Sequence, residues 1–209
     1  SDLNMVFNIA EINRIVPINK VIHVGGFRGE ELESYRSIGV KDTIMFEPQK
    51  RMYEIIKSQL TPTESVHNVA LGCEKGEMEL NISHRSGGVE NGDGASSSLL
   101  KPKVHLTEHP EVTFTHTETV KVCVLDDYEF FDANFMNIDV QGYELHVLKG
   151  SEKTLLNVDS LIVEVNRDEV YENCCQVEEV DYFLNQRGFT RVKAIWQSQS
   201  WGDALYVKR

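Results

Sequence analysis

The chain has 209 residues, of which 41% are hydrophobic and 26% are charged. This size and composition predict one folded α/β domain with an elaborated insertion; they leave little room for two full domains and exclude a disordered or collagen-like chain. The formal net charge of −12 argues against a surface that follows nucleic-acid phosphates, because such a surface needs clustered Lys and Arg.

The apolar segments and the N-terminus indicate the cellular location of the protein. The longest apolar runs, such as residues 161–165, are the length of a strand and far below the roughly 20 residues of a membrane span. The first 20 residues lack the basic start and the continuous apolar segment of a signal peptide. We therefore expect a cytoplasmic protein with no membrane span and no nucleic-acid partner.

The first third of the chain predicts alternating strands and helices. Short β-branched runs end in turn residues, and apolar residues at helical spacing lie between them. The expected elements are a strand at 20–24, a helix at 29–38, a strand at 42–46, a helix from 48 to about 60 and a strand at 65–71.

The alternation changes after the third strand. Met78, Leu80 and Ile82 alternate with polar residues and predict a strand, and residues 113–125 predict another. Residues 84–110 between them are rich in Gly, Ser, Asn and His, and loops of this length are usually functional or disordered. We therefore expect a single domain of residues 1–209, with an N-terminal segment at 1–19 and a β/loop insertion at 72–124.

The last third returns to alternating elements. The expected elements are a strand at 135–140, a helix at 142–157, a strand at 161–165, a helix from 177 to 188 and two closing strands at 189–195 and 204–207. This order predicts a mostly parallel sheet with helices on both faces. Such sheets bind ligands beyond the carboxyl ends of their strands, where Gly25, Glu47, Asp139 and Glu164 are expected.

A glycine turn follows the first strand in the segment His23-Val-Gly-Gly-Phe-Arg-Gly29. Glycine lets the backbone approach a ligand closely and permits positive φ. The segment lacks the full G-x-G-x-x-G spacing, so a tight β-α turn without a ligand is an equally good interpretation.

Glu47 lies 18 residues beyond Gly29, at the end of the second expected strand. Nucleotide-binding α/β folds place an acidic residue there to accept hydrogen bonds from both ribose hydroxyls. The alternative is a carboxylate that complements the start of the next helix. Together with the glycine turn, we favour ribose binding, although these residues alone do not choose between NAD and S-adenosylmethionine.

A longer segment carries a family resemblance. The segment Asn137-Ile-Asp-Val-Gln-Gly-Tyr-Glu-Leu-His-Val-Leu-Lys-Gly150, followed by Leu161-Ile-Val-Glu-Val165, resembles the "I-D-V-[EQ]-G-x-E-L-x-V-L-x-G" block and the "E-V" strand of the FkbM methyltransferases. The resemblance extends to the glycine turn, to Phe46-Glu-Pro48, to Asn68-Val-Ala-Leu-Gly72 and to Ser97-Ser-Leu99, so it covers roughly residues 21–165.

The resemblance implies a class I, Rossmann-like methyltransferase fold with a seven-stranded sheet, six strands parallel and the last antiparallel. It implies S-adenosylmethionine as the cofactor, with its methionine part at the glycine turn, its ribose at Glu47 and its adenine near Ala70 and Leu71. Asp139 would face the methyl group and the substrate. The implied cofactor-binding residues are Gly25, Gly26, Phe27, Gly29, Glu47, Ala70, Leu71 and Asp139.

The reaction implied by the resemblance is O-methylation of a hydroxyl on a sugar, a glycan or a natural product. Asp139 is the candidate catalytic base or substrate anchor, with capping of the following helix as the alternative. We expect no metal, and the acceptor is a small molecule or a glycan. A non-catalytic S-adenosylmethionine-binding module and an NAD-dependent enzyme are the alternatives.

One residue departs from the family pattern. His23 stands where the family usually has Asp, an acidic residue that complements the cationic end of the cofactor in related folds. An imidazole at this position weakens that electrostatic match. Glu30 or Glu31 could supply the missing negative charge.

Overall fold

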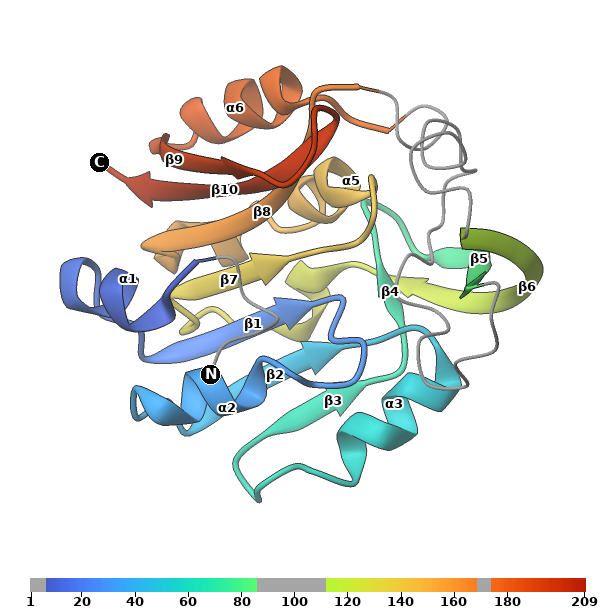
Figure 1. Ribbon diagram of the computed structural model, residues 1–209. Coiled ribbons are helices and arrows are strands. Elements are labelled where there is room, and N and C mark those ends of the chain that lie inside the picture. Colours follow the sequence, from blue (N-terminus) through green and yellow to red (C-terminus); the bar gives the residue numbers. More distant parts are fainter. Residues whose placement is uncertain (1–6, 86–111, 169–173) are drawn as a thin grey trace.

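The computed structural model describes residues 7–85, 112–168 and 174–209. Its centre is a seven-stranded sheet in the order β3-β2-β1-β7-β8-β10-β9 (Figure 1). Neighbouring strands from β3 to β8 pair in parallel, and β10 pairs antiparallel with both β8 and β9. Six strands therefore run in one direction and the last strand of the chain runs against them, which confirms the expected fold class.

The strands of this sheet lie close to the predicted ranges. They are β1 Lys20–Val24, β2 Asp42–Phe46, β3 Ser65–His67, β7 Phe135–Ile138, β8 Ser160–Asn166, β9 Phe189–Trp196 and β10 Trp201–Lys208. The central strands β7 and β8 are buried throughout, as expected for a parallel sheet that is covered on both faces. The carboxyl ends of β1, β2 and β7 point to the same edge of the sheet (Figure 1).

Helices cover both faces of the sheet. One face carries α1 Ile9–Ile15, α2 Leu32–Ser37 and α3 Lys50–Lys57, whose apolar side chains pack on β1, β2 and β7. The other face carries α5 Glu144–Lys149 and α6 Val177–Asn185, together with the short 3-10 helices η1 Leu125–Tyr128 and η2 Thr154–Asn157. These helices enclose the larger of the two apolar layers.

The third predicted strand, at 65–71, is wrong as a single element. The chain leaves the main sheet after His67 and re-enters a strand at Ala70, so that β4 Ala70–Leu71 belongs to a second, three-stranded sheet. The break lies at Asn68, whose side-chain amide donates to the carbonyl oxygens of Glu47 and Pro48, both at 2.9 Å. These bonds turn the chain toward the end of β2.

The second sheet holds the predicted insertion strands, β5 Gly76–Arg85 and β6 Val112–Cys123, in the order β4-β6-β5. It lies beside the carboxyl ends of the main strands (Figure 1). Most of the predicted loop at 84–110 lies outside the described residues. No helix among residues 7–85, 112–168 and 174–209 is long and apolar enough to cross a membrane.

The predicted helix at 142–157 is also wrong as a continuous element. It is divided into α5 and η2. A Cβ at Gly150 would lie 2.2 Å from the carbonyl oxygen of Gly72, so the insertion passes the chain too closely for a side chain at this position. The carboxylate of Asp126 then accepts hydrogen bonds from the backbone amides of Lys153 and Thr154 and begins η2.

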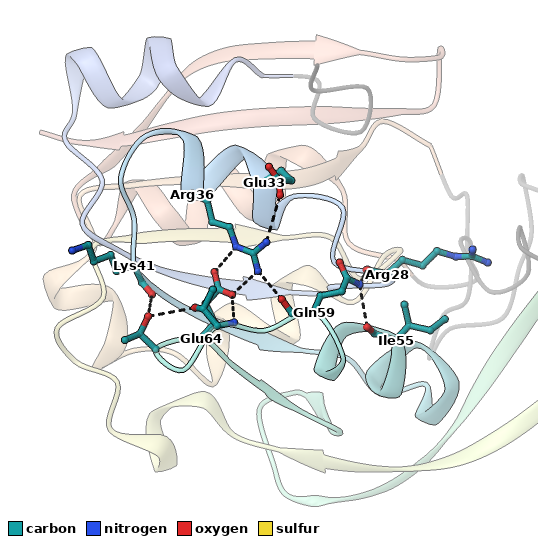
Figure 2. A network of polar contacts seen from close by, with 9 residues as sticks. Arg28, Glu33, Arg36, Lys41, Ile55, Gln59 and Glu64 are labelled. Carbon is teal, nitrogen blue, oxygen red and sulfur yellow. Dashed lines mark hydrogen bonds and ion pairs between the residues drawn. The ribbon is translucent and has the colours of Figure 1, made fainter.

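A polar network links α2 to the residues that follow α3 and precede β3 (Figure 2). The guanidinium of Arg36 in α2 donates to both carboxylate oxygens of Glu64, at 2.9 and 2.6 Å, and to the carbonyl of Gln59. Gln59 in turn donates its side-chain amide to the carbonyl of Arg28 at 2.8 Å. The network therefore reaches the end of the glycine turn and fixes it relative to α3.

Candidate functional site

The glycine turn meets the Asp139 backbone at the end of β7. A Cβ at Gly25 would lie 1.9 Å from the Asp139 carbonyl oxygen, and Gly25 has φ +90°, a conformation that glycine tolerates. The amides of Gly25 and Gly26 donate to the carbonyl of Phe46, and the amide of Asp139 donates to that of Val24. The ends of β1, β2 and β7 are thus held together around Gly25 and Gly26.

Glu47 reaches back from the end of β2 into the glycine turn. Its side chain is buried; Oε1 accepts from the Phe27 amide at 2.7 Å and Oε2 from the Gln49 amide at 2.8 Å. Burial raises the pKa of Glu47 to about 8, and the two amide bonds oppose that rise. Each oxygen keeps acceptor capacity for a further donor, which fits a ribose diol.

The remaining predicted cofactor residues take different positions. A Cβ at Gly26 would meet Ile56 at 3.0 Å, and one at Gly29 would meet Leu32 at 3.2 Å, so both glycines permit close packing of the turn against the helices. Ala70 and Leu71, which form β4, are buried in two different apolar clusters. Their contact with an adenine stays a prediction.

Asp139 is the exposed member of a carboxylate cluster at the end of β7. Gln141, which has φ +54°, donates its side-chain amide to Asp139 Oδ1 at 2.8 Å and to Glu164 Oε2 at 3.0 Å. Glu144 accepts from the amides of Val140 and Gly142 at 2.7 and 2.9 Å. Glu144 rather than Asp139 therefore bonds the amides of this loop, which leaves the Asp139 carboxylate turned to solvent and oriented by Gln141.

Burial raises the pKa of the other acids around Asp139. Burial raises the pKa of Glu144 to about 8 and that of Asp203 to about 7, and the Asp139 charge adds to both. Burial, followed by the Asp139 charge, also raises the pKa of Glu164. Oxygens of Asp139, Glu144 and Glu164 lie within 4.8 Å of one another, but each side chain already accepts a hydrogen bond from the protein. We assign no metal to them.

His23 lies in a buried polar group under the glycine turn. Its Nδ1 is 2.7 Å from the hydroxyl of Tyr35, and the side-chain amide of Asn137 donates to the same hydroxyl at 3.1 Å. Burial lowers the pKa of His23 to about 4, so the imidazole is neutral near pH 7. Glu31 is its acidic neighbour, with 3.9 Å between His23 Nε2 and Glu31 Oε2.

Sequence reasoning gave no role to two residues that shape the site. Gln141 fixes the Asp139 carboxylate, and Asn68 fixes the backbone of Glu47 and Pro48. Both lie within the segments that carry the family resemblance, but their roles depend on contacts across the sheet. The local sequence does not predict the positive φ of Gln141 or the break between strands at Asn68.

Replacement of Asn68 by Ala is expected to weaken S-adenosylhomocysteine binding several-fold and to lower the free energy of unfolding by about 1–3 kcal/mol. The variant leaves two carbonyl oxygens beside Glu47 without their donor. Calorimetric titration and urea unfolding measure the two effects. Asn185→Ala, at an exposed position of α6, is the control and should change stability by less than about 0.5 kcal/mol. Equal results for the two variants would contradict the positioning role.

Comparison with known proteins bears on the family. The Methyltransferase FkbM domain matches residues 23–191. The chain is 27% identical over 161 residues to the 2-O-methyltransferase NoeI of Sinorhizobium fredii (strain NBRC 101917 / NGR234), covering 73% of this chain and 65% of NoeI. The chain thus spans slightly less than two thirds of this curated relative.

Solved structures share the fold. The methyltransferase FkbM from Methylobacillus flagellatus KT superposes with a TM-score of 0.59 at 14% identity, over 91% of this chain and 43% of that protein. The magnesium protoporphyrin IX methyltransferase from Synechocystis PCC 6803, solved with bound S-adenosylmethionine, gives 0.53 at 9% identity, over 96% and 74%. The NAD-dependent alternative finds no support in these matches.

The family match confirms the resemblance read from the sequence. It spans the glycine turn, Glu47 and the Asp139 loop, and membership of this methyltransferase family makes S-adenosylmethionine the cofactor. The cofactor contacts of Gly25 and Glu47 stay predictions. The chain therefore belongs to the FkbM family of S-adenosylmethionine-dependent methyltransferases.

Proposed function

We propose that this protein transfers the methyl group of S-adenosylmethionine to a hydroxyl of a sugar, a glycan or a natural product. The observation that carries the proposal is the position of Asp139. Its exposed carboxylate is held by Gln141 at the end of β7, while its own carbonyl contacts the glycine turn. An acceptor and the cofactor can therefore meet at one residue.

The bound cofactor supplies an electrophilic methyl group on a sulfonium. Gly25, Gly26, Phe27 and Gly29 would hold its methionine part, Glu47 its ribose, and Ala70 and Leu71 would border its adenine. Asp139 would orient the acceptor hydroxyl and take its proton as the oxygen forms its bond to the methyl carbon. The carbon–sulfur bond breaks in the same step, and its electron pair stays on the sulfur of S-adenosylhomocysteine.

The acceptor class is supported by the relation to NoeI, which is a 2-O-methyltransferase. The alignment covers only 65% of NoeI, so we assign a hydroxyl acceptor to this protein as a proposal. The predicted loop at 84–110, which lies largely outside the described residues, stays the expected source of acceptor contacts. The cytoplasmic location and the lack of a nucleic-acid partner also stay predictions.

Incubation with labelled S-adenosylmethionine and a panel of saccharides and natural products bearing hydroxyls tests the proposal. We expect S-adenosylhomocysteine to form in proportion to a methyl ether on one acceptor class, at a rate above that without acceptor. Calorimetric titration with S-adenosylhomocysteine and with NADH accompanies the assay. Tight binding of the former without turnover on any acceptor would instead favour the non-catalytic module.

A further inference from the structure

Glu31 lies where the glycine turn enters α2. Its Oε2 is 3.9 Å from Nε2 of His23, which is too long for a hydrogen bond. The carboxylate does not cap α2, because no side-chain capping bond is present at Glu31. Glu31 is therefore an acidic side chain beside the glycine turn that does not act as a helix cap.

The Oε2 atom of Glu31 is buried and accepts no hydrogen bond from any described residue. A buried carboxylate oxygen without a donor costs free energy, so the neutral form is favoured. Burial accordingly raises the pKa of Glu31 to about 8. The free protein thus keeps an acceptor that lacks a donor beside its cofactor turn.

Among the described residues, no cationic group contributes to the shift in the Glu31 pKa. His23 on β1 is neutral near pH 7, Tyr35 on α2 is a phenol whose pKa burial raises further, and Glu30 and Asp139 are acids that add to the rise in the Glu31 pKa. These groups on β1, on α2 and after β7 are thus neutral or negative. A cationic ligand would satisfy Glu31 where the protein does not.

We propose that Glu31 is the acidic residue that receives the cationic methionine end of S-adenosylmethionine in this chain, in place of an acid at position 23. The inference rests on the proposed function and deepens it. The methionine end carries a sulfonium and an ammonium group. Glu31 follows the glycine turn in the chain, and its Oε2 lies 3.9 Å from His23 Nε2.

The change Glu31→Gln tests this role, because it keeps the shape of the neutral side chain and removes its charge. Calorimetric titration at pH 8.5 should show S-adenosylmethionine binding weakened roughly tenfold. Binding of 5′-methylthioadenosine, which lacks both cationic groups, should stay within about twofold of wild type. S-Adenosylhomocysteine retains the ammonium but lacks the sulfonium. If Glu31→Gln also weakens its binding, Glu31 receives the ammonium; if its binding is unchanged, Glu31 receives the sulfonium.

The pH dependence gives a readout that a purely structural role would not move. Glu31 has a raised pKa of about 8, so it is neutral well below that pH and charged above it. The wild-type advantage over Glu31→Gln should therefore grow from about threefold or less at pH 6 to its full value at pH 8.5. Proton release on binding of S-adenosylmethionine to the wild type, measured in two buffers of different ionisation enthalpy, should disappear in the variant.

Two matched changes serve as controls. Glu33→Gln alters an 88% exposed side chain of α2 and should bind the cofactor as wild type does. Glu30→Gln should change binding less than Glu31→Gln, because Glu31 and not Glu30 lies beside His23. Wild-type affinity in Glu31→Gln at pH 8.5, or an equal loss for 5′-methylthioadenosine, would overturn the inference. Failure of the wild type itself to bind S-adenosylmethionine would instead overturn the proposed function.

Discussion

Replacement of Asp139 by Asn is expected to lower methyl-transfer turnover by about 10²- to 10⁴-fold, the usual loss when a positioned general base is removed. The amide keeps the size of the side chain, and its oxygen can still accept from Gln141. It cannot take the acceptor proton. S-Adenosylhomocysteine should bind within about threefold of wild type, because the Asp139 backbone that contacts Gly25 is unchanged.

The matched control for this change is Asp132→Asn. Asp132 is exposed and pairs with Lys20 at 2.9 Å, at the start of β1 and thus at the opposite edge of the sheet. Its replacement should leave turnover within about twofold. Single-turnover rates with saturating cofactor separate the chemical step from binding. Full turnover in Asp139→Asn with unchanged affinity would remove Asp139 from the catalytic role.

The sheet was predictable because its strands are short β-branched runs that end in turn residues. Lys20–Val24 and Asp42–Phe46 have the predicted bounds, and their parallel pairing follows from the helix between them. The predicted strand at 65–71 and the predicted helix at 142–157 were wrong because contacts with distant parts of the chain interrupt them. Asn68 bonds across to the end of β2, and Gly150 stops a helix where the carbonyl of Gly72 approaches it. Neither partner is near in sequence.

The candidate site was predictable as a set of strand ends, and Gly25 and Asp139 do come together. The chemistry of its acids was not predictable. The sequence points to Glu47 as a ribose ligand and to Glu31 as a source of negative charge, but it does not show that burial raises the pKa of these residues and of Glu144 to about 8. A pKa shift of this kind depends on how neighbouring elements exclude water, which no local pattern records.

These buried acids give the departure at His23 its physical meaning. A neutral imidazole bonded to Tyr35 costs little to bury, whereas an acid at position 23 would place a further buried carboxyl group beside Glu31. The chain therefore carries its acidic side chain at residue 31, after the glycine turn, rather than on β1 at position 23. Glu31 and Asp139 lie on different segments, so the position of the glycine turn relative to Asp139 sets the distance between the proposed cofactor and acceptor sites.

Replacement of Gly25 by Ala tests that position and is expected to lower the free energy of unfolding by at least about 3 kcal/mol. The side chain would meet the Asp139 carbonyl oxygen at 1.9 Å, and φ +90° is unfavourable for alanine. The loop after β7 must then move, and a displacement of about 1 Å can cost about 10²-fold in rate. Urea unfolding and turnover of the folded fraction measure the two losses.

Gly39→Ala separates the two causes of this loss. Gly39 has nearly the same backbone conformation, φ +89°, but no heavy atom lies within 4 Å of the position that its Cβ would take. It should therefore show the backbone strain alone, about 1–2 kcal/mol, with turnover unchanged. The difference between the variants measures the contact between the glycine turn and Asp139. Equal losses of stability and rate would show that the Asp139 loop can yield to a side chain, and the close approach would then not be what aligns acceptor and cofactor.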